Sequence, residues 1–367
     1  MDYSNDSRIV MTLDAGGTNF VFSAIQGNNE IIKPVTLPSN AHSLKLCLDT
    51  ITDGFTIVKD SLHDYPVAIS FAFPGPSDYP AGIIGDLGNL PAFRGGVAVG
   101  PMLEEQFHLP VFINNDGDLF AYGEAIAGFL PEVNQKLKNL GSYKHYNNLF
   151  GVTLGTGFGG GIVRNGELFL GDNSGSAEIW LMRHKDLDTF VEEGASIRAV
   201  QKEYCEKAGI KTDNPPSPKD IFDIAMGEKA GNQKAAVRAF ERLSEVVGDA
   251  LSNAITLIDG LMVIGGGLAG AQSLILPGIV KEMNSSIYTL DGKKFDRLEA
   301  RVYNLEDEEE FFSFARGDER EITIPGTNKK LRYDPLKRVG VGISRLGTSK
   351  AVSLGAYAFA LFNLDRS

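Results

Sequence analysis

The chain has few cysteines and a deficit of basic residues, and each shortage excludes a class of protein. Two cysteines, Cys47 and Cys205, are too few for a disulfide framework or a cysteine-rich zinc site, so a reducing compartment is expected. Only 35 lysine and arginine residues stand against 47 aspartate and glutamate residues, which gives a net charge of −12. Such a charge disfavours non-specific binding to nucleic acid or to an anionic membrane. We therefore expect no nucleic-acid partner and no membrane partner.

Long apolar runs are lacking as well. No segment approaches the roughly 20 apolar residues that cross a bilayer. The first residues, Met1 to Ser7, do not have the basic and apolar regions of a signal peptide. These absences predict a cytoplasmic protein. With 367 residues, of which 43% are hydrophobic and 22% charged, the chain is long enough for two domains with substantial cores.

Glycine, by contrast, is abundant, and many of its 42 residues fall in clusters next to apolar runs. Three predicted strands run into glycine clusters, which are Gly16-Gly17-Thr18, Gly155-Thr156-Gly157 and Gly265-Gly266-Gly267. Backbone N–H groups in such turns can hold phosphate oxygens, because glycine lets a ligand approach the backbone closely. Two such loops, far apart in the chain, predict one polyphosphate held between two domains. For each loop taken alone, the alternative is an ordinary tight turn.

Two segments match the dinucleotide-binding pattern G-x-G-x-x-G by letter. Gly155, Gly157 and Gly160 form the first match, but a hairpin turn at Arg164-Asn165-Gly166 follows it instead of a helix. The second match begins at Gly265, late in the chain, where the first βαβ unit of a dinucleotide-binding fold would be out of place. A dehydrogenase is therefore not favoured.

Strands and helices alternate in the second half of the chain. Apolar residues recur at three- and four-residue spacing from Asn232 to Ile258, which predicts a long helix, and residues 261–264 follow it as a strand. This alternation predicts an α/β protein. From about Asp291 to Pro335 the sequence becomes charged and includes an acidic run from Glu306 to Glu310. We interpret this segment as a surface insertion.

Asp116 is the candidate catalytic residue. It follows the predicted strand 111–113, in the sequence Asn114-Asn115-Asp116, where a side chain would be held rigidly. Phosphoryl transfer to an alcohol needs a carboxylate that accepts the hydroxyl proton. The alternative is that these polar residues only cap the helix that follows.

Several motifs together resemble the ROK family of bacterial sugar kinases and repressors. The motifs are Asp14-x-Gly-Gly-Thr18, Pro74-Gly-Pro76, Asn115-Asp116, residues 154–161 and Ile264-Gly-Gly-Gly267. Their order and spacing match the family from about residue 8 to 285 and again from 338 to the end. The resemblance implies an α/β fold of the two-domain, actin-like ATPase type with ribonuclease-H-like topology, a cleft between the domains, and ATP and magnesium as cosubstrates. It places the N-terminal domain at residues 1–130, joined by a C-terminal helix at 350–367, and the larger domain at 131–349 with the insertion at about 291–335.

The resemblance also implies roles for individual residues. Asp116 is the catalytic base, and Asp14 serves the magnesium ion. The sugar-binding residues are Asn89, Asn115, Glu178 and Glu192. The ATP-binding residues are Gly16, Gly17, Thr18, Gly155, Thr156, Gly157, Gly266 and Gly267. For the two glutamates the alternative is an exposed capping or salt-bridging role.

The chain departs from the family at the zinc motif. Leu181 stands where many relatives have a histidine that binds both sugar and zinc, and the cysteines of that site are missing. His184 lies nearby, but one histidine without further ligands at the right spacing is not a zinc site. We therefore expect no structural zinc. Trp180 is the only tryptophan, and it faces either the sugar or the core.

The function predicted from these residues is ATP-dependent phosphorylation of a hexose, with a glucokinase-like activity as the first candidate. The alternative is a sugar-binding sensor or regulator of the same family without kinase activity. Only 13 residues precede Asp14 and the chain is acidic, so a DNA-binding repressor is not expected. Because dimers are common in the family, a homodimer is also expected.

Overall fold

The computed structural model describes residues 3–75, 77–85 and 93–366, and the chain folds into two compact units. The first unit comprises Met1–Pro131, Gly160–Ala177 and Arg345–Ser367, and the second comprises Glu132–Gly159 and Glu178–Ser344. The chain therefore passes from one unit to the other at several points along its length. No helix among the described residues is long and apolar enough to span a membrane.

The first unit is built on a sheet of the order β3-β2-β1-β5-β9, with β4 pairing with β2. Its strands are β1 (Val10–Ala15), β2 (Asn19–Gln26), β3 (Asn29–Glu30), β4 (Val35–Pro38), β5 (Ala68–Ala72) and β9 (Val111–Asn114). β1, β5 and β9 are parallel, and Asp14 aligns with Ala72, which in turn aligns with Asn114. Asp14 and the start of the Asn115-Asp116 segment therefore leave the sheet at the same edge.

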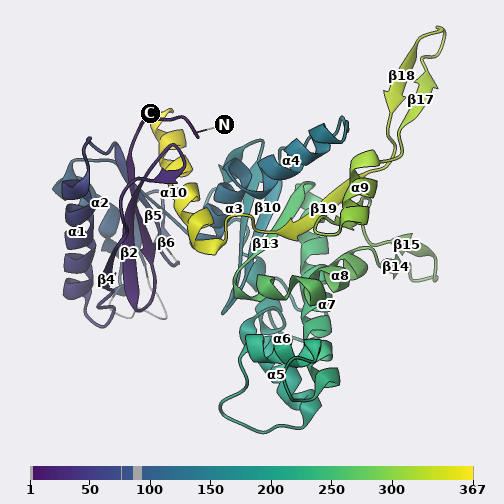
Figure 1. Cartoon of the computed structure of the whole chain (residues 1–367), viewed down its shortest axis with the longest axis horizontal. Coiled ribbons are helices and arrows are strands. Elements are labelled where there is room, and N and C mark those ends of the chain that lie inside the picture. Colours follow the sequence, from purple (N-terminus) through teal and green to yellow (C-terminus); the bar gives the residue numbers. More distant parts are fainter. Residues whose placement is uncertain (1–2, 76, 86–92, 367) are drawn as a thin grey trace. The chain divides into compact units, whose positions relative to one another are not determined.

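Helices cover both faces of this sheet (Figure 1). The flanking helices are α1 (Leu44–Ser61), α2 (Val99–Phe107), α3 (Asp116–Ile126) and α10 (Thr348–Leu364). On the α1 face, large apolar side chains such as Phe22, Phe55 and Phe71 form the core. On the other face, α10 contacts β1, β5 and β9 and packs closely against α3.

Glycine allows α3 and α10 to approach each other backbone to backbone. A Cβ atom at Gly123 would lie 2.0 Å from the carbonyl oxygen of Ala351, and one at Gly355 would lie 1.9 Å from that of Leu119. Neither distance is compatible with a side chain. The C-terminal helix is thus fitted to α3, the helix that begins at Asp116.

Short strands complete the first unit. They are β6 (Ser77–Asp78), β7 (Ile83–Ile84), β8 (Val97–Ala98) and β12 (Glu167–Phe169). The first three form a small antiparallel sheet, and β12 pairs with the end of β11 (Phe158–Arg164). The turn between β11 and β12 contains Asn165 and Gly166, both at positive φ, as expected for the Asn-Gly hairpin turn.

The second unit contains the parallel neighbours β10, β13, β19 and β16, in that order. These strands are β10 (Leu149–Leu154), β13 (Leu261–Gly265), β16 (Arg301–Asn304) and β19 (Arg338–Ile343). The long helix α7 (Gln233–Ile258) precedes β13, with Asn232 as its N-cap. The prediction of an α/β protein is confirmed.

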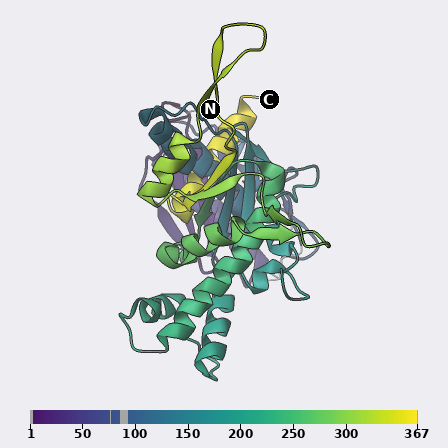
Figure 2. The same cartoon turned by 90° about the vertical axis from the view of Figure 1, so that its right-hand side faces the viewer.

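The second unit contains further helices. They are α4 (Phe129–Asn139), which begins in the first unit, η2 (Ile179–Leu181), η3 (Val191–Glu193), α5 (Ile197–Ala208), α6 (Pro218–Met226), η4 (Gly267–Ala271), α8 (Gln272–Met283) and α9 (Glu308–Arg316). α5, α6 and α8 each contact α7, and both views show α5 and α6 against the lower half of that helix (Figures 1 and 2).

The segment interpreted as a surface insertion is only partly on the surface. It includes β16, a strand of the main sheet in which Val302 and Tyr303 are buried. Two exposed hairpins flank this part of the chain and project from the unit (Figures 1 and 2): β14 (Ser286–Tyr288) with β15 (Lys294–Asp296), and β17 (Arg320–Thr323) with β18 (Lys330–Tyr333). The charged stretches on both sides of β16 masked this short strand, which has only one charged residue, Arg301.

The acidic run is not a solvated loop. It forms the start of α9, where the Asp307 side chain caps the helix by accepting a hydrogen bond from Glu310 N. The carboxylate of Glu306 accepts a hydrogen bond of 2.8 Å from Ile343 N on β19. Acidic side chains are favourable at a helix N-terminus because they complement the helix dipole.

Candidate active site

The first glycine turn joins β1 to β2 and carries an exposed backbone. Ser39 holds the turn, since its hydroxyl donates to Gly17 O at 2.8 Å and its N–H donates to Thr18 O at 2.9 Å. A Cβ atom at Gly17 would meet no atom within 4 Å, whereas one at Gly16 would lie 2.8 Å from Asn19 O. Gly16 is therefore required by the turn itself, and Gly17 leaves open space over the backbone where a ligand can approach.

Asp116 is the first residue of α3, directly after β9. The N-cap of this helix is Asn115, whose side-chain oxygen accepts a hydrogen bond of 2.6 Å from Asp118 N. The capping role considered in the sequence analysis therefore belongs to Asn115. One Asp116 carboxylate oxygen accepts a hydrogen bond of 2.9 Å from Gly117 N, and the residue remains open to solvent. Asp116 is thus free of the cap and available for chemistry.

The surroundings of Asp116 favour its protonated form. Although the residue keeps contact with solvent, protein atoms crowd its carboxyl group, and this desolvation is the main reason that its pKa is raised above the usual value. The negative charge of Asp14 raises the pKa further, and the hydrogen bond from Gly117 N opposes the shift. A carboxylate with a raised pKa is a stronger proton acceptor.

The start of α3 is held by direct backbone contact with β11. A Cβ atom at Gly117 would lie 2.5 Å from Gly160 O. One at Gly161 would lie 2.5 Å from Gly117 O and 2.7 Å from the Cα of Asp118. The run of glycines at the start of β11 therefore fixes the helix turn that carries Asp116, a role that the sequence motif did not reveal.

In the second unit, the loop Gly155-Thr156-Gly157 is held in place by Glu192. One carboxylate oxygen of Glu192 accepts a hydrogen bond of 2.9 Å from Phe158 N, and a Cβ atom at Gly157 would lie 2.8 Å from that oxygen. A Cβ atom at Gly155 would meet no atom within 4 Å. As at Gly17, the side-chain position over Gly155 is open, while its N–H donates to Gly157 O at 3.0 Å and its carbonyl accepts from Ile197 N at 2.8 Å.

Arg198 completes this support and was not identified from the sequence. Its guanidinium group donates to the second carboxylate oxygen of Glu192 at 2.8 Å and to Thr156 O at 3.3 Å. Both oxygens of Glu192 are therefore used within the protein. The sugar-binding role predicted for Glu192 stays a prediction, and the structure gives this residue a second role as the support of the loop.

The third glycine cluster lies beside the second. β10 and β13 are parallel neighbours, with Thr153 aligned with Gly265, so the loops after both strands emerge at one edge of the sheet. Gly266 has φ +87° and its Cβ atom would lie 2.2 Å from Leu154 O, so only glycine fits there. Gly267 has no neighbour within 4 Å of its Cβ position. Carboxyl ends of parallel strands are the usual ligand-binding edge of an α/β sheet.

The other predicted sugar-binding residues are less well supported. Glu178 is exposed and accepts a hydrogen bond from the indole N–H of Trp180, whose ring packs edge-to-face on Phe190 at 5.8 Å. Leu181 is 57% exposed. Asn89 lies outside the described residues.

The side chain of His184 is buried and hydrogen-bonded to its own backbone segment. Its Nδ1 accepts hydrogen bonds from Asp186 N at 3.1 Å and Leu187 N at 3.2 Å. In the described part of the chain, no three histidine, cysteine, aspartate or glutamate residues are grouped as metal ligands.

Known proteins share both the sequence and the fold. The sequence profile of the ROK family matches residues 10–304. The N-acetyl-D-glucosamine kinase of Vibrio vulnificus is 28% identical over 272 residues, which cover 71% of this chain and 84% of that protein. The crystal structure of glucokinase from Parabacteroides distasonis matches with a TM-score of 0.90 and 56% identity, over 98% of this chain and 99% of that one.

A more distant structure supports the fold alone. The ROK family glucokinase of Streptomyces griseus, in complex with glucose and AMPPNP, matches with a TM-score of 0.61 and 18% identity over 96% of this chain and 98% of that one. Together these matches confirm the two-domain, actin-like ATPase fold predicted from the motifs. The chain therefore belongs to the ROK family, and it is an ATP-dependent sugar kinase.

Proposed function

We propose that this kinase transfers the γ-phosphoryl group of ATP to a hydroxyl group of a hexose, that glucose is its first candidate substrate, and that Asp116 is the general base. The observation that carries the choice of sugar is the 56% identity to the glucokinase of Parabacteroides distasonis over nearly the whole of both chains. The curated relatives named N-acetyl-D-glucosamine kinase are more distant, at 28% identity. An N-acetylhexosamine is therefore the second candidate, with fructose and mannose behind it.

Asp116 suits the role of base for two reasons. Its carboxylate is not part of the helix cap, and its raised pKa, caused first by desolvation and then by the charge of Asp14, strengthens it as a proton acceptor. As the nucleophilic oxygen attacks the γ-phosphorus, Asp116 accepts the hydroxyl proton, and the phosphoryl group leaves ADP. Asn115 presents an amide group beside it that can donate to a sugar oxygen.

The glycine loops are the proposed phosphate-binding segments. Gly17 and Gly267 leave the space over their backbone open, so that N–H groups can approach phosphate oxygens without obstruction, and the space over Gly155, whose own N–H donates to Gly157 O, is open as well. Ser39 supports the first loop, and Glu192 with Arg198 supports the second. Because these loops are held before any ligand arrives, little ordering remains to oppose nucleotide binding.

The residues at the end of β1 fit a magnesium ion. Magnesium in kinases is held by one or two carboxylates together with phosphate oxygens. Asp14 is a half-buried carboxylate beside the first glycine loop, and its charge acts on Asp116, which shows that negative charge accumulates here. Asp14 would hold the ion, directly or through water. When bound, the ion neutralises charge that develops on the transferring phosphoryl group.

The test is the variant Asp116→Asn, assayed by coupled ADP release with glucose, N-acetylglucosamine, fructose and mannose. We expect kcat to fall by about 10²- to 10⁴-fold, because the proton acceptor is lost. Binding of a non-hydrolysable ATP analogue, measured by calorimetry, should be nearly unchanged. The exposed carboxylate Asp53 on α1 provides the control, since Asp53→Asn should retain full turnover.

Two outcomes would contradict the proposal. If Asp116→Asn keeps substantial turnover, another residue is the base. If the wild-type protein binds a sugar in the calorimeter but releases no ADP with any of the four, the chain is a sensor that has lost kinase activity.

A further inference from the structure

The segment between Met182 and Val191 is a closed hairpin. Its ends are joined by a hydrogen bond of 2.7 Å from Val191 N to Met182 O, and His184 N donates to Thr189 O at 2.9 Å. An isolated antiparallel bridge pairs Arg183 with Phe190. η2 precedes this hairpin, and η3 follows it.

The His184 imidazole fills the interior of the hairpin. The residue is 3% exposed, whereas most of its neighbours in the hairpin face solvent. Because Nδ1 accepts hydrogen bonds from two backbone N–H groups, those of Asp186 and Leu187, it must carry no proton. The hydrogen of the neutral ring is therefore on Nε2. Nε2 lies against Gly194, where a Cβ atom would approach it to 2.6 Å.

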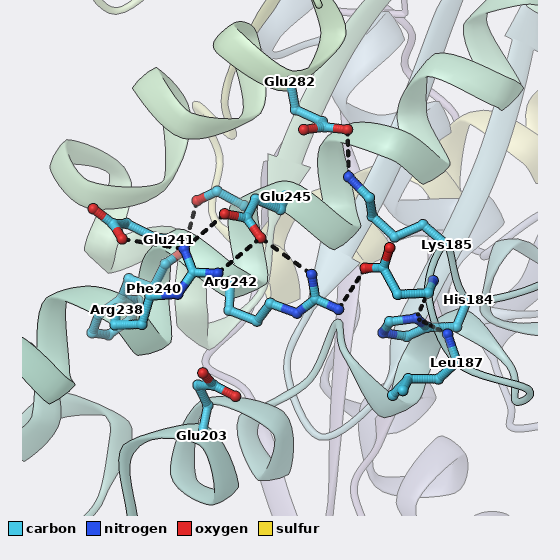
Figure 3. Close-up of polar contacts among 12 residues, drawn as sticks. His184, Lys185, Leu187, Glu203, Arg238, Phe240, Glu241, Arg242, Glu245 and Glu282 are labelled. Atoms are coloured by element: carbon cyan, nitrogen blue, oxygen red, sulfur yellow. Dashed lines mark hydrogen bonds and ion pairs between the residues drawn. The ribbon is translucent and has the colours of Figure 1, made fainter. Parts of the chain in front are cut away.

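Ion pairs fasten the hairpin to two helices (Figure 3). Asp186 pairs with Arg242 on α7 at 2.7 Å, and Lys185 pairs with Glu282 on α8 at 2.6 Å. Arg242 is itself oriented by Glu245, which lies 3.2 Å away on the same helix. Fixed charges and hydrogen bonds thus hold this hairpin in the absence of any cysteine ligand.

The hairpin leads directly into the support of the phosphate loop. Gly194, which rests on the His184 ring, follows η3, and its N–H donates to Val191 O at 2.9 Å. η3 carries Glu192, and Glu192 accepts the hydrogen bond from Phe158 N that holds the Gly155–Gly157 loop. A continuous path of contacts therefore runs from the imidazole to the loop within one unit.

We propose that His184 in its neutral form is a positioning residue, which holds η3 and Glu192 so that the Gly155–Gly157 loop is ready for the phosphates of ATP. The part of this inference that concerns ATP rests on the proposed function. The part that concerns the hairpin does not. Protonation of His184 removes the acceptor at Nδ1, releases the Asp186 and Leu187 N–H groups, and loosens the hairpin.

The charged side chains around His184 both lower and raise its pKa. Burial is the main cause that lowers the pKa of His184, and the positive charges of Arg242 and Lys185 lower it further. Asp186 in the hairpin and Asp249 on α7 oppose them. Because folding lowers the pKa of this histidine, its neutral form stabilises the folded state. The stabilisation is complete above the ordinary histidine pKa of about 6.5, and it is lost as the pH falls through the lower pKa of the folded state. The hairpin therefore loosens on acidification.

Trp180 provides a readout that does not depend on catalysis. It is the only tryptophan of the chain, it lies in η2 directly before the hairpin, and its ring packs on Phe190 at the far end of the hairpin. Opening of the hairpin separates the two rings. The intrinsic fluorescence of the protein consequently reports the state of the hairpin.

The experiment compares the full-length wild-type protein with His184→Asn and His184→Ala between pH 5 and 8. An asparagine places an oxygen acceptor close to the position of Nδ1 and does not titrate in this range. We expect a reversible shift of Trp180 emission on acidification in the wild type, no such shift in His184→Asn, and an opened hairpin at all pH values in His184→Ala. The exposed His63 gives the control, since His63→Ala should behave as the wild type.

Kinetics then test the link to the phosphate loop. We expect His184→Ala to raise KM for ATP about tenfold, with a smaller effect on KM for the sugar, because loss of the two hydrogen bonds to the imidazole removes preorganisation of the loop. His184→Asn should restore KM for ATP and abolish its rise at low pH. A wild-type emission shift that persists in His184→Asn, or an unchanged KM for ATP in His184→Ala, would overturn the inference. If no sugar is phosphorylated, the fluorescence titration still decides the part that concerns the hairpin.

Discussion

Substitution of Gly161 by alanine tests whether the close contact between β11 and α3 positions Asp116. The added Cβ atom would lie 2.5 Å from Gly117 O, 2.7 Å from the Cα of Asp118 and 2.8 Å from the Cβ of Ala121. Ordinary van der Waals contact begins near 3.4 Å. The first turn of α3 must therefore retreat by about 0.6 to 0.9 Å, which is the difference between that separation and the distances in the structure.

This displacement should affect both stability and catalysis. Overpacking of a close-packed site costs about 1–3 kcal/mol in the free energy of unfolding. A displacement of the catalytic carboxylate by nearly 1 Å should lower kcat by about 10- to 100-fold, because phosphoryl transfer depends on the alignment of the reacting groups. KM for ATP should change little, since the support of the Gly155–Gly157 loop by Glu192 is untouched.

The assay is coupled ADP release with the best sugar of the panel, together with thermal unfolding of the same protein. Gly270→Ala is the matched control, because its Cβ atom would meet no atom within 4 Å and its φ is not in the left-handed region. That variant should keep wild-type kcat and thermal stability. A Gly161→Ala enzyme with unchanged kcat would refute the reasoning, since it would mean that β11 does not position the first turn of α3.

Two further predictions concern carboxylates of α3. Crowding of the Asp116 carboxyl group by protein atoms and the charge of Asp14 raise the pKa of Asp116, so its ionised form destabilises the fold above the ordinary aspartate pKa. Asp116→Asn should therefore unfold at a higher temperature than the wild type at pH 7, with the difference vanishing below about pH 4; a lower unfolding temperature at pH 7 would contradict this. The second prediction concerns Glu124, which is buried and accepts hydrogen bonds from the backbone N–H groups of Phe129, Arg345 and Leu346, at 2.7, 3.3 and 3.1 Å. Glutamine replaces one of the two acceptor oxygens by an amino group, so Glu124→Gln should lower the free energy of unfolding in urea by about 2 kcal/mol. An unchanged urea midpoint would show that these bonds add no net stability.

Local sequence patterns predicted the parts of the site that depend on neighbouring residues. Apolar runs ending in glycine identified the ends of β1, β10 and β13, since a strand and the turn after it are encoded within about ten residues of each other. The same reasoning placed Asp116 directly after β9. The long helix before β13 was predicted to within one residue because its apolar face repeats over 26 residues.

Some residues support a loop or a sheet through contacts with segments distant in the chain, and no local sequence pattern indicates such a role. Glu192 was expected to face a sugar, yet its carboxylate holds Phe158 N, 34 residues away in the chain. Arg198 reaches back to Thr156 O, and β16 enters the main sheet from a segment whose charge suggested a surface insertion. Such pairings arise only when the strands have assembled.

The sequence by itself determined the family, the three glycine turns and the position of the candidate base, because each depends on a short run of neighbouring residues whose local conformation follows from their residue types. Only the tertiary structure decided which residues hold those turns in place. Gly161 supports α3 by leaving room for another backbone, and His184 supports Glu192 through a neutral ring buried in a hairpin. Both effects depend on how closely distant segments pack, and that distance is a property of the folded chain alone.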